Sequence, residues 1–244
     1  MHRYKIADVV FDAKTKYVYS ERICKPYEYC GEEKPSFTVE ITDEDVAFER
    51  EKAELTGVNY PDAYLESLAL FRKLCDYLLD KADGIVFHSS AIMVDGEAYL
   101  FTAPSGTGKS THTALWRKLL GDRAVMVNDD KPIIRCIDGE FFVYGTPWTG
   151  KHKLGNNTRA KIKAICKIYQ SKENVIKVAE AKEMIFVILG QTIRPTDLDK
   201  MRKLTTIIDK MLGAVDKYTL GCNMDISAAE LAYKTMKSGG KDEN

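Results

Sequence analysis

The chain has 244 residues, and its 36 basic and 36 acidic residues give a formal net charge of zero. A balanced charge provides no general attraction to nucleic acids or anionic membranes, so we expect neither as a partner. The longest apolar runs are far shorter than the roughly 20 residues that cross a bilayer, and the first residues lack the apolar core of a signal peptide. The composition therefore predicts a cytoplasmic protein.

Residues 1–82 are expected to form a β-rich segment followed by a helix. The short alternating runs "YKIADVVF", "KYVYS" and "SFTVEI" predict antiparallel strands joined by turns. The charged stretch 43–54 predicts a loop or a solvated face. From Pro61 onward, leucines and Phe71 recur at helical spacing, which predicts a core-packing helix that ends near Ala82. We expect this segment to pack on a larger domain of residues 83–238, with a disordered tail at 239–244.

The middle of the chain predicts a strand that leads directly into a helix. The apolar runs 85–94 and 97–103 are separated by Asp95-Gly96, a strong signal for a β-hairpin. The pattern of 109–121 is helical, with Gly121 as a stop, and 124–130 is a β-branched run that ends in acids. The residues between 103 and 109 therefore connect the end of a strand to the start of a helix.

The remaining residues alternate between strand and helix patterns, which is typical of an α/β protein. A second Asp-Gly hairpin spans 131–145, and 146–158 is rich in glycine and basic residues without a period. The elements expected after it are strands at 160–170 and 174–179, helices at 180–192 and 196–212, a strand at 217–224, and a last helix that starts with the capping box Ser227 to Glu230.

The connection after the strand, "FTAPSGTGKSTH" at 101–112, is similar to a phosphate-binding loop. Its residues Gly108, Lys109 and Ser110 fit the end of the pattern G-x-x-x-x-G-K-[ST], whereas Ala103 stands where the pattern has its first glycine. Such a loop points backbone N–H groups at a phosphate, next to the positive end of a helix dipole. A methyl group at 103 is tolerated if φ is negative there.

The loop predicts binding of ATP and Mg²⁺. Lys109 supplies a cation for the β- and γ-phosphates, and the hydroxyl of Ser110 can bind the metal ion. The residues expected to hold the nucleotide are Ser105, Gly106, Thr107, Gly108, Lys109, Ser110 and Thr111. The alternative is that this glycine-rich segment is only a turn.

Two acids and a histidine are the other candidates for chemistry. Asp129 and Asp130 end a strand about 20 residues after the lysine, where phosphate-loop proteins present an acid to Mg²⁺. A second acid can take the proton of an attacking hydroxyl. His88 lies in an apolar run, on the strand expected to pair with the one that feeds the loop. A turn at Asp129 and Asp130, and a core position for His88, are the structural alternatives.

The motifs "H-S-S-A", "A-P-S-G-T-G-K-S-T" and "N-D-D" occur in this order and together resemble the catalytic core of HPr kinase/phosphorylase and phosphoenolpyruvate carboxykinase. With "G-T-P-W-T-G-K", the likeness is to the short HPr-kinase-like proteins of bacteria. The resemblance implies an α/β phosphate-loop fold with mixed β-sheets and flanking helices. It also implies that His88 lies near the transferred phosphate, that Asp129 is the catalytic base, and that Asp130 is the acid on the metal side.

These observations together predict a kinase that phosphorylates a hydroxyl group, namely serine, free or in a peptide or small protein. Lys151, His152 and Lys153 are equally compatible with a phosphate clamp and with a solvated loop. One alternative is a nucleotide-sensing module without catalysis, and another is a carboxykinase-like activity. The chain lacks the arginine-glycine signature of HPr kinases after the acids, and it is shorter than half of a usual carboxykinase. A homo-oligomer is compatible with the sequence.

Overall fold

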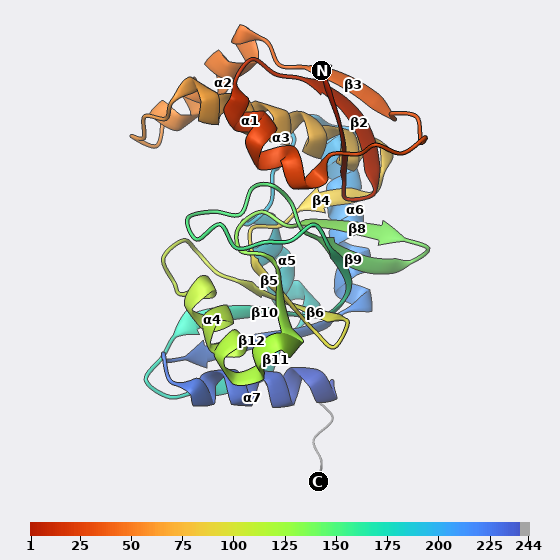
Figure 1. Ribbon diagram of the computed structural model, residues 1–244. Coiled ribbons are helices and arrows are strands. Elements are labelled where there is room, and N and C mark those ends of the chain that lie inside the picture. The colour runs from red at the N-terminus through yellow and green to blue at the C-terminus, as the bar shows by residue number, and fades with distance from the viewer. Residues whose placement is uncertain (240–244) are drawn as a thin grey trace. The chain divides into compact units, whose positions relative to one another are not determined.

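The structure is a computed structural model that describes residues 1–239 and consists of two compact units, Met1–Lys81 and a second unit that begins at Ala82 (Figure 1). The elements of the first unit are β1 (His2–Ile6), β2 (Val9–Lys14), α1 (Val18–Cys24), the 3₁₀ helix η1 (Lys25–Tyr27), β3 (Phe37–Glu40), α2 (Asp43–Glu54) and α3 (Asp62–Lys81). The long helix α3 confirms the prediction from leucine spacing.

The first three strands form a sheet in the order β1-β2-β3. β1 and β2 are antiparallel as predicted, but β3 runs parallel to β2, with Phe11 opposite Phe37. The prediction of antiparallel pairing was therefore wrong for β3. The chain between β2 and β3 passes through α1 and η1, and a crossover of this kind is what parallel pairing requires.

Helix α1 begins within the run "KYVYS", at Val18, where the sequence predicted a strand. The buried carboxylate of Glu66, on α3, accepts hydrogen bonds from the backbone N–H of Tyr17 at 3.1 Å and from the hydroxyl of Ser20 at 2.8 Å. It thus satisfies donors at the start of α1 that a strand would pair with a neighbour. The prediction was wrong because this partner comes from 49 residues further along the chain.

The charged stretch 43–54 is helix α2 and not a loop. Thr42 caps it through a capping box with Asp45, which satisfies two backbone donors of the first turn. On its inner side Glu49 is buried and accepts a hydrogen bond from Nε of Arg72, on α3, at 2.6 Å. Partners on α3 therefore decide the conformation of a stretch that has almost no apolar pattern.

The second unit contains a mixed sheet with helices on its faces (Figure 1). Its elements are β4 (Gly84–Val86), β5 (Ser90–Val94), β6 (Glu97–Thr102), α4 (Lys109–Leu120), the 3₁₀ helix η2 (Gly121–Arg123), β7 (Ala124–Asn128), β8 (Ile133–Ile137), β9 (Glu140–Tyr144), β10 (Arg159–Gln170), β11 (Val175–Val178), α5 (Ala181–Leu189), α6 (Leu198–Ala214), β12 (Asp216–Cys222) and α7 (Ile226–Ser238). The mixed α/β class is as predicted, and so are the positions of most elements.

The strand order of this sheet is β4-β8-β9-β10-β6-β5-β7, with β12 pairing with β10 and β11 with β12. β10 is parallel to β6 and to β12, while β9, on the same edge of β10 as β12, is antiparallel. Both predicted hairpins are present, and Asp95, Gly96, Asp138 and Gly139 have the positive φ that their tight turns need.

The core beside the candidate loop lies between the sheet and helices α4 and α7 (Figure 1). Trp116 of α4 is fully buried against Tyr99 and Phe101 of β6, with ring centroids 5.0 and 5.2 Å apart. Aromatic contacts of this size anchor α4 firmly on the strand that precedes it. The first turn of α4 therefore has a fixed place relative to the end of β6.

The last helix begins at Ile226 with Asp225 as its N-cap, two residues before the predicted N-cap Ser227. The carboxylate of Asp225 accepts from the backbone N–H of Ser227 at 2.9 Å. Gly239 caps the other end, and residues 240–244 of the predicted tail lie outside the described residues.

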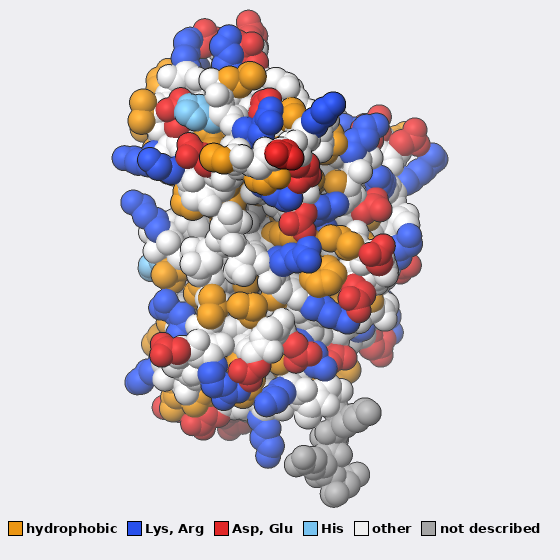
Figure 2. Space-filling model, turned by 45° about the vertical axis from the view of Figure 1, so that its right-hand side comes forward, with side chains coloured by type: hydrophobic (Ala, Val, Ile, Leu, Met, Phe, Trp, Pro, Cys, Tyr) orange, Lys and Arg blue, Asp and Glu red, His pale blue; other side chains and the backbone are white. Residues whose placement is uncertain are grey.

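Within residues 1–239, no helix combines the length and apolar character needed to cross a membrane. Acidic and basic side chains are interspersed on the face in Figure 2.

Candidate active site

The connection between β6 and α4 has the backbone of an anion-binding turn. Gly106 and Gly108 have φ of +80° and +118°, and a Cβ at either position would meet nothing within 4 Å. Glycine is therefore required there by backbone conformation and not by lack of space. Gly108 is the N-cap of α4, and among the described residues no side chain caps this helix. The N–H groups and the dipole of its first turn are thus directed at the loop.

Ala103, which replaces the first glycine of the motif, is part of the core. Ala103 is 1% exposed and belongs to the same apolar cluster as Phe101 and Trp116. Ala103 is not among the non-glycine residues with positive φ. An alanine therefore fits here without backbone strain, and its methyl group contributes to packing.

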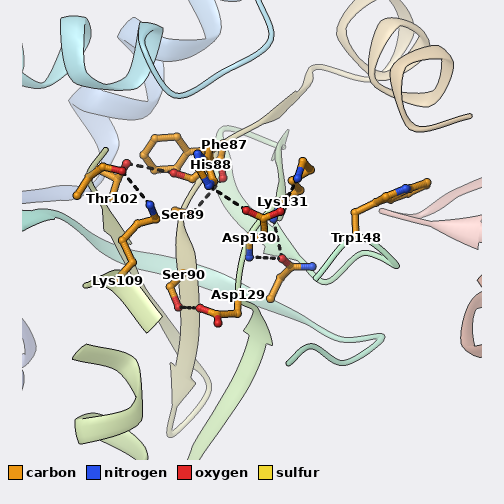
Figure 3. Close-up of polar contacts among 12 residues, drawn as sticks. Phe87, His88, Ser89, Ser90, Thr102, Lys109, Asp129, Asp130, Lys131 and Trp148 are labelled. Carbon is orange, nitrogen blue, oxygen red and sulfur yellow. Dashed lines mark hydrogen bonds and ion pairs between the residues drawn. The ribbon is translucent and has the colours of Figure 1, made fainter. Parts of the chain in front are cut away.

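Lys109 is buried at the start of α4 and bends back over the loop (Figure 3). Its Nζ donates a hydrogen bond to the carbonyl of Ala103 at 2.9 Å. Burial lowers the pKa of Lys109, and the carboxylates of Asp130 and Asp129 act in the opposite direction. Both carboxylates therefore lie within electrostatic reach of this ammonium group.

Asp129 is tied to the first turn of α4 through two hydroxyl groups. It is 7% exposed, and its Oδ1 accepts a short hydrogen bond from Oγ of Ser90, the first residue of β5. Oγ of Ser90 also lies 2.9 Å from Oγ1 of Thr113, which in turn donates to the carbonyl of Ser110 at 3.2 Å. Within residues 1–239, no hydrogen bond to the second carboxylate oxygen of Asp129 is present.

Asp130 points away from Asp129 and pairs with two basic side chains (Figure 3). Nε2 of His88 lies 2.9 Å from its Oδ1, and Lys131 forms a short ion pair with its Oδ2. Burial alone raises the pKa of Asp130, but the hydrogen bonds and charges of His88 and Lys131 outweigh it and lower this pKa to about 2. The carboxylate is therefore ionised throughout the neutral range.

His88 lies in a break between two strands and not within one strand, as the sequence had suggested. β4 ends at Val86 and β5 begins at Ser90. The backbone N–H of His88 donates to the carbonyl of Gln191 at 2.7 Å, and that of Ser89 donates to the carbonyl of Asp130 at 3.3 Å. These long-range bonds replace strand pairing and direct the imidazole at Asp130.

Asn128 and Thr146 are site residues that the sequence interpretation missed. Both are 0% exposed. Oδ1 of Asn128 accepts from the backbone N–H of Asp130 and of Lys131, each at 2.8 Å. Its Nδ2 donates to Oγ1 of Thr146 at 3.0 Å and to the carbonyl of Thr146 at 3.1 Å. Asn128 thus fixes the acid-bearing turn, and the signal was a polar side chain at the last position of a buried strand.

Thr146 begins the glycine-rich segment 146–158, and the part around Leu154 and Asn156 lies along the end of β7. The carbonyl of Leu154 accepts from the backbone N–H of Asp129 at 3.0 Å, and Asn156 donates its backbone N–H to Val127 at 3.1 Å. Gly150 is so close to Asp130 that an added Cβ would lie 2.9 Å from the Asp130 Cβ. This segment, which had no predicted structure, therefore forms one wall beside the acids.

The residues present fit a magnesium ion that shares its coordination with phosphate. Mg²⁺ is usually held by one or two protein oxygens, together with substrate phosphates and water. Ser110 is partly exposed on the first turn of α4, and Asp130 offers an ionised carboxylate. Within residues 1–239, no three histidine, cysteine or acidic side chains gather in an all-protein metal site. The other predicted loop residues, Ser105, Thr107 and Thr111, lie in or next to the same turn at the surface.

No protein-family model and no curated protein sequence matches the chain. Among solved structures, the chain is similar to the HPr(Ser) kinase/phosphatase from Coxiella burnetii. The identity is 10%, the TM-score is 0.36, and the similar region covers 63% of this chain and 94% of that protein. With identity and TM-score both this low, the likeness is a distant one of fold.

Proposed function

We propose that the chain is an ATP- and Mg²⁺-dependent phosphotransferase that phosphorylates a hydroxyl group, with serine, free or in a peptide or small protein, as the acceptor. One observation carries the proposal. The glycine turn with Lys109 and two differently paired carboxylates come together from separate segments of the second unit. A turn without this function has no need to hold one buried and one half-buried acid within electrostatic reach of a buried lysine.

In this proposal the start of α4 holds the nucleotide. The backbone N–H groups of residues 105–111 and the dipole of α4 would bind its phosphates. Lys109 would exchange the Ala103 carbonyl for the β- and γ-phosphates. Ser110 and Asp130 would hold Mg²⁺, which would supply positive charge to the phosphates of bound ATP.

The two acids would divide the remaining work because their surroundings differ. Asp130 stays ionised over the whole neutral range, which suits a metal ligand and makes it a poor proton acceptor. Asp129 uses one oxygen for Ser90 and would accept the proton of the acceptor hydroxyl on the other. His88, which donates to Asp130, would stabilise negative charge on the transferred group.

The test begins with nucleotide binding by the Lys109→Ala variant, measured by calorimetry with ATP and Mg²⁺. We expect a loss of affinity of about tenfold or more, because a charge-assisted contact to phosphate is removed. Lys118→Ala, at an exposed position of the same helix, is the matched control and keeps the parent affinity. Equal ATP affinity of Lys109→Ala and the parent protein rejects the nucleotide site.

Transfer from γ-labelled ATP to serine, serine peptides and small proteins then separates an enzyme from a binding module. Label on an acceptor hydroxyl supports the phosphotransferase. Tight ATP binding without transfer to any of these acceptors indicates a nucleotide-sensing module instead. Decarboxylation of oxaloacetate in a parallel assay would indicate the carboxykinase-like alternative.

A further inference from the structure

Residues 150–153 form a turn that carries an unneutralised positive charge. The side chains of Lys151, His152 and Lys153 are all exposed. Within residues 1–239, none of the three has an ion-pair or hydrogen-bond partner for its side chain. Two other lysines of this unit are paired, Lys161 with Glu140 and Lys131 with Asp130. The basic groups of this turn, which we call the basic turn, are therefore available to a ligand.

The basic turn has a defined position next to the acids. Gly150 has φ of +69° and lies against Asp130, where a Cβ would come within 2.9 Å of the Asp130 Cβ. Lys153 also has a positive φ, of 51°, which is uncommon for a residue other than glycine. Its side chain direction is thus set by a specific backbone conformation and not by a regular element.

Both ends of the basic turn are anchored to β7 and the turn that follows it. Before it, the buried side chain of Thr146 is bonded to Asn128. After it, Leu154 accepts from the backbone N–H of Asp129 at 3.0 Å. A surface loop that only carried charge for solubility would not need attachment to both Asn128 and Asp129.

The charges around the site leave an excess of cations on this side. Asp130 already neutralises Lys131, and in the proposed function Lys109 faces the nucleotide phosphates. Lys151 and Lys153 then have neither an acid nor the nucleotide to balance them, although the chain as a whole is neutral. Unpaired ammonium groups on a fixed turn can bind oxyanions such as phosphate and carboxylate.

We infer that the basic turn is a subsite for a negatively charged group of the acceptor, so that the acceptor is an anionic compound or residue that carries a phosphate or carboxylate besides its hydroxyl. This inference rests on the proposed function. Lys151 and Lys153 bind the anion, and the attachment to Asp129 and Asp130 sets its distance from the reacting hydroxyl.

The experiment fills the nucleotide site first and then titrates a simple anion. The protein is saturated with Mg²⁺ and a non-hydrolysable ATP analogue, so that phosphate cannot bind in place of the γ-phosphate. Inorganic phosphate is added and its Kd is measured by calorimetry, with acetate as the carboxylate probe in a parallel titration. The variant Lys151→Gln/Lys153→Gln, which we call the loop variant, removes both lysine charges from the basic turn. The control, Lys177→Gln/Lys234→Gln, removes the same charge at two exposed positions on β11 and α7.

We expect the loop variant to raise the Kd of phosphate by about tenfold, because two charge-assisted contacts are lost, while the analogue binds as before. The control variant keeps the parent Kd for both ligands. Equal phosphate affinity of the loop variant and the parent, or no phosphate binding by the parent, overturns the inference. Loss of analogue affinity in the loop variant assigns the basic turn to the nucleotide instead. If the parent does not bind the analogue, the proposed function fails. The basic turn is then tested by titrating phosphate into the protein alone, where the loop variant must still have a higher Kd than the control variant.

Discussion

His112 makes the stability of the second unit depend on pH in a way that one substitution can remove. It lies on α4 and is 2% exposed, and its Nε2 accepts a hydrogen bond from Nε1 of Trp116 at 3.1 Å. Its Nδ1 is buried, and residues 1–239 offer it no hydrogen-bond partner. Burial lowers the pKa of His112 from 6.5 to about 4, so the folded protein keeps the ring neutral where the unfolded chain would already be protonated.

The sign and size of the effect follow from this difference. Between the two pKa values the unfolded chain binds more protons than the folded one, so stability falls as the pH falls from 6.5 toward 4. Relative to neutral pH, His112 costs about 2 kcal/mol of unfolding free energy at pH 5 and about 3 kcal/mol at pH 4. Above pH 6.5 both states carry the neutral ring and the contribution vanishes.

His112→Gln retains an acceptor for Trp116 but cannot be protonated. We expect urea unfolding curves, followed by tryptophan fluorescence at pH 7 and 5, to show that this variant loses about 2 kcal/mol less stability than the parent between the two pH values. His112→Leu serves if the glutamine variant folds poorly, and His152→Gln, at an exposed position, is the control. A parent protein and His112→Gln that lose the same free energy over this range refute the reasoning.

Asp129→Asn should lower single-turnover phosphoryl transfer by about 10²-fold or more with ATP affinity within a few-fold, since it removes the proton acceptor; transfer at the parent rate contradicts this role. Asp130→Asn should instead weaken Mg²⁺ dependence and ATP affinity together, seen in magnesium titrations. Ala103→Gly should change ATP affinity by no more than about tenfold, because the methyl group packs in the core and needs no positive φ; a larger gain indicates a degenerate loop. Asn128→Ala should lower the unfolding free energy by about 3 kcal/mol, because it leaves buried partners unpaired, and urea unfolding measures it; a loss under 1 kcal/mol argues against the fixed turn.

Elements whose signal is local could be predicted from the sequence. The two Asp-Gly hairpins are present because the turn itself demands positive φ, and the strand, glycine turn and helix around Lys109 each carry their own pattern. The same is true of the two neighbouring acids at the end of β7. These features include every residue of the proposed nucleotide site.

The elements and residues that were predicted wrongly or missed share one cause. Each depends on a partner that lies far away in the sequence. α1 depends on Glu66, and the inner side of α2 depends on Arg72. The break at His88 depends on the carbonyl of Gln191. Thr146 gave no signal because its partner, Asn128, lies 18 residues earlier and joins it only in the folded chain. Periodicity in the sequence indicates the local conformation that a segment prefers. At these positions the conformation is decided by tertiary contacts instead.

The place of β10 in the sheet has a consequence for synthesis of the chain. Every residue of the proposed site precedes Thr158, yet β10, which begins at Arg159, pairs with both β9 and β6. It thereby joins the strands β4, β8 and β9 to the strands β5, β6 and β7. A nascent chain that has emerged only as far as Thr158 contains every residue of the proposed site. Its strands, however, still form two separate groups that β10 has not yet joined. The site can be completed only after its last chemical residue has left the ribosome and the following strand has been added.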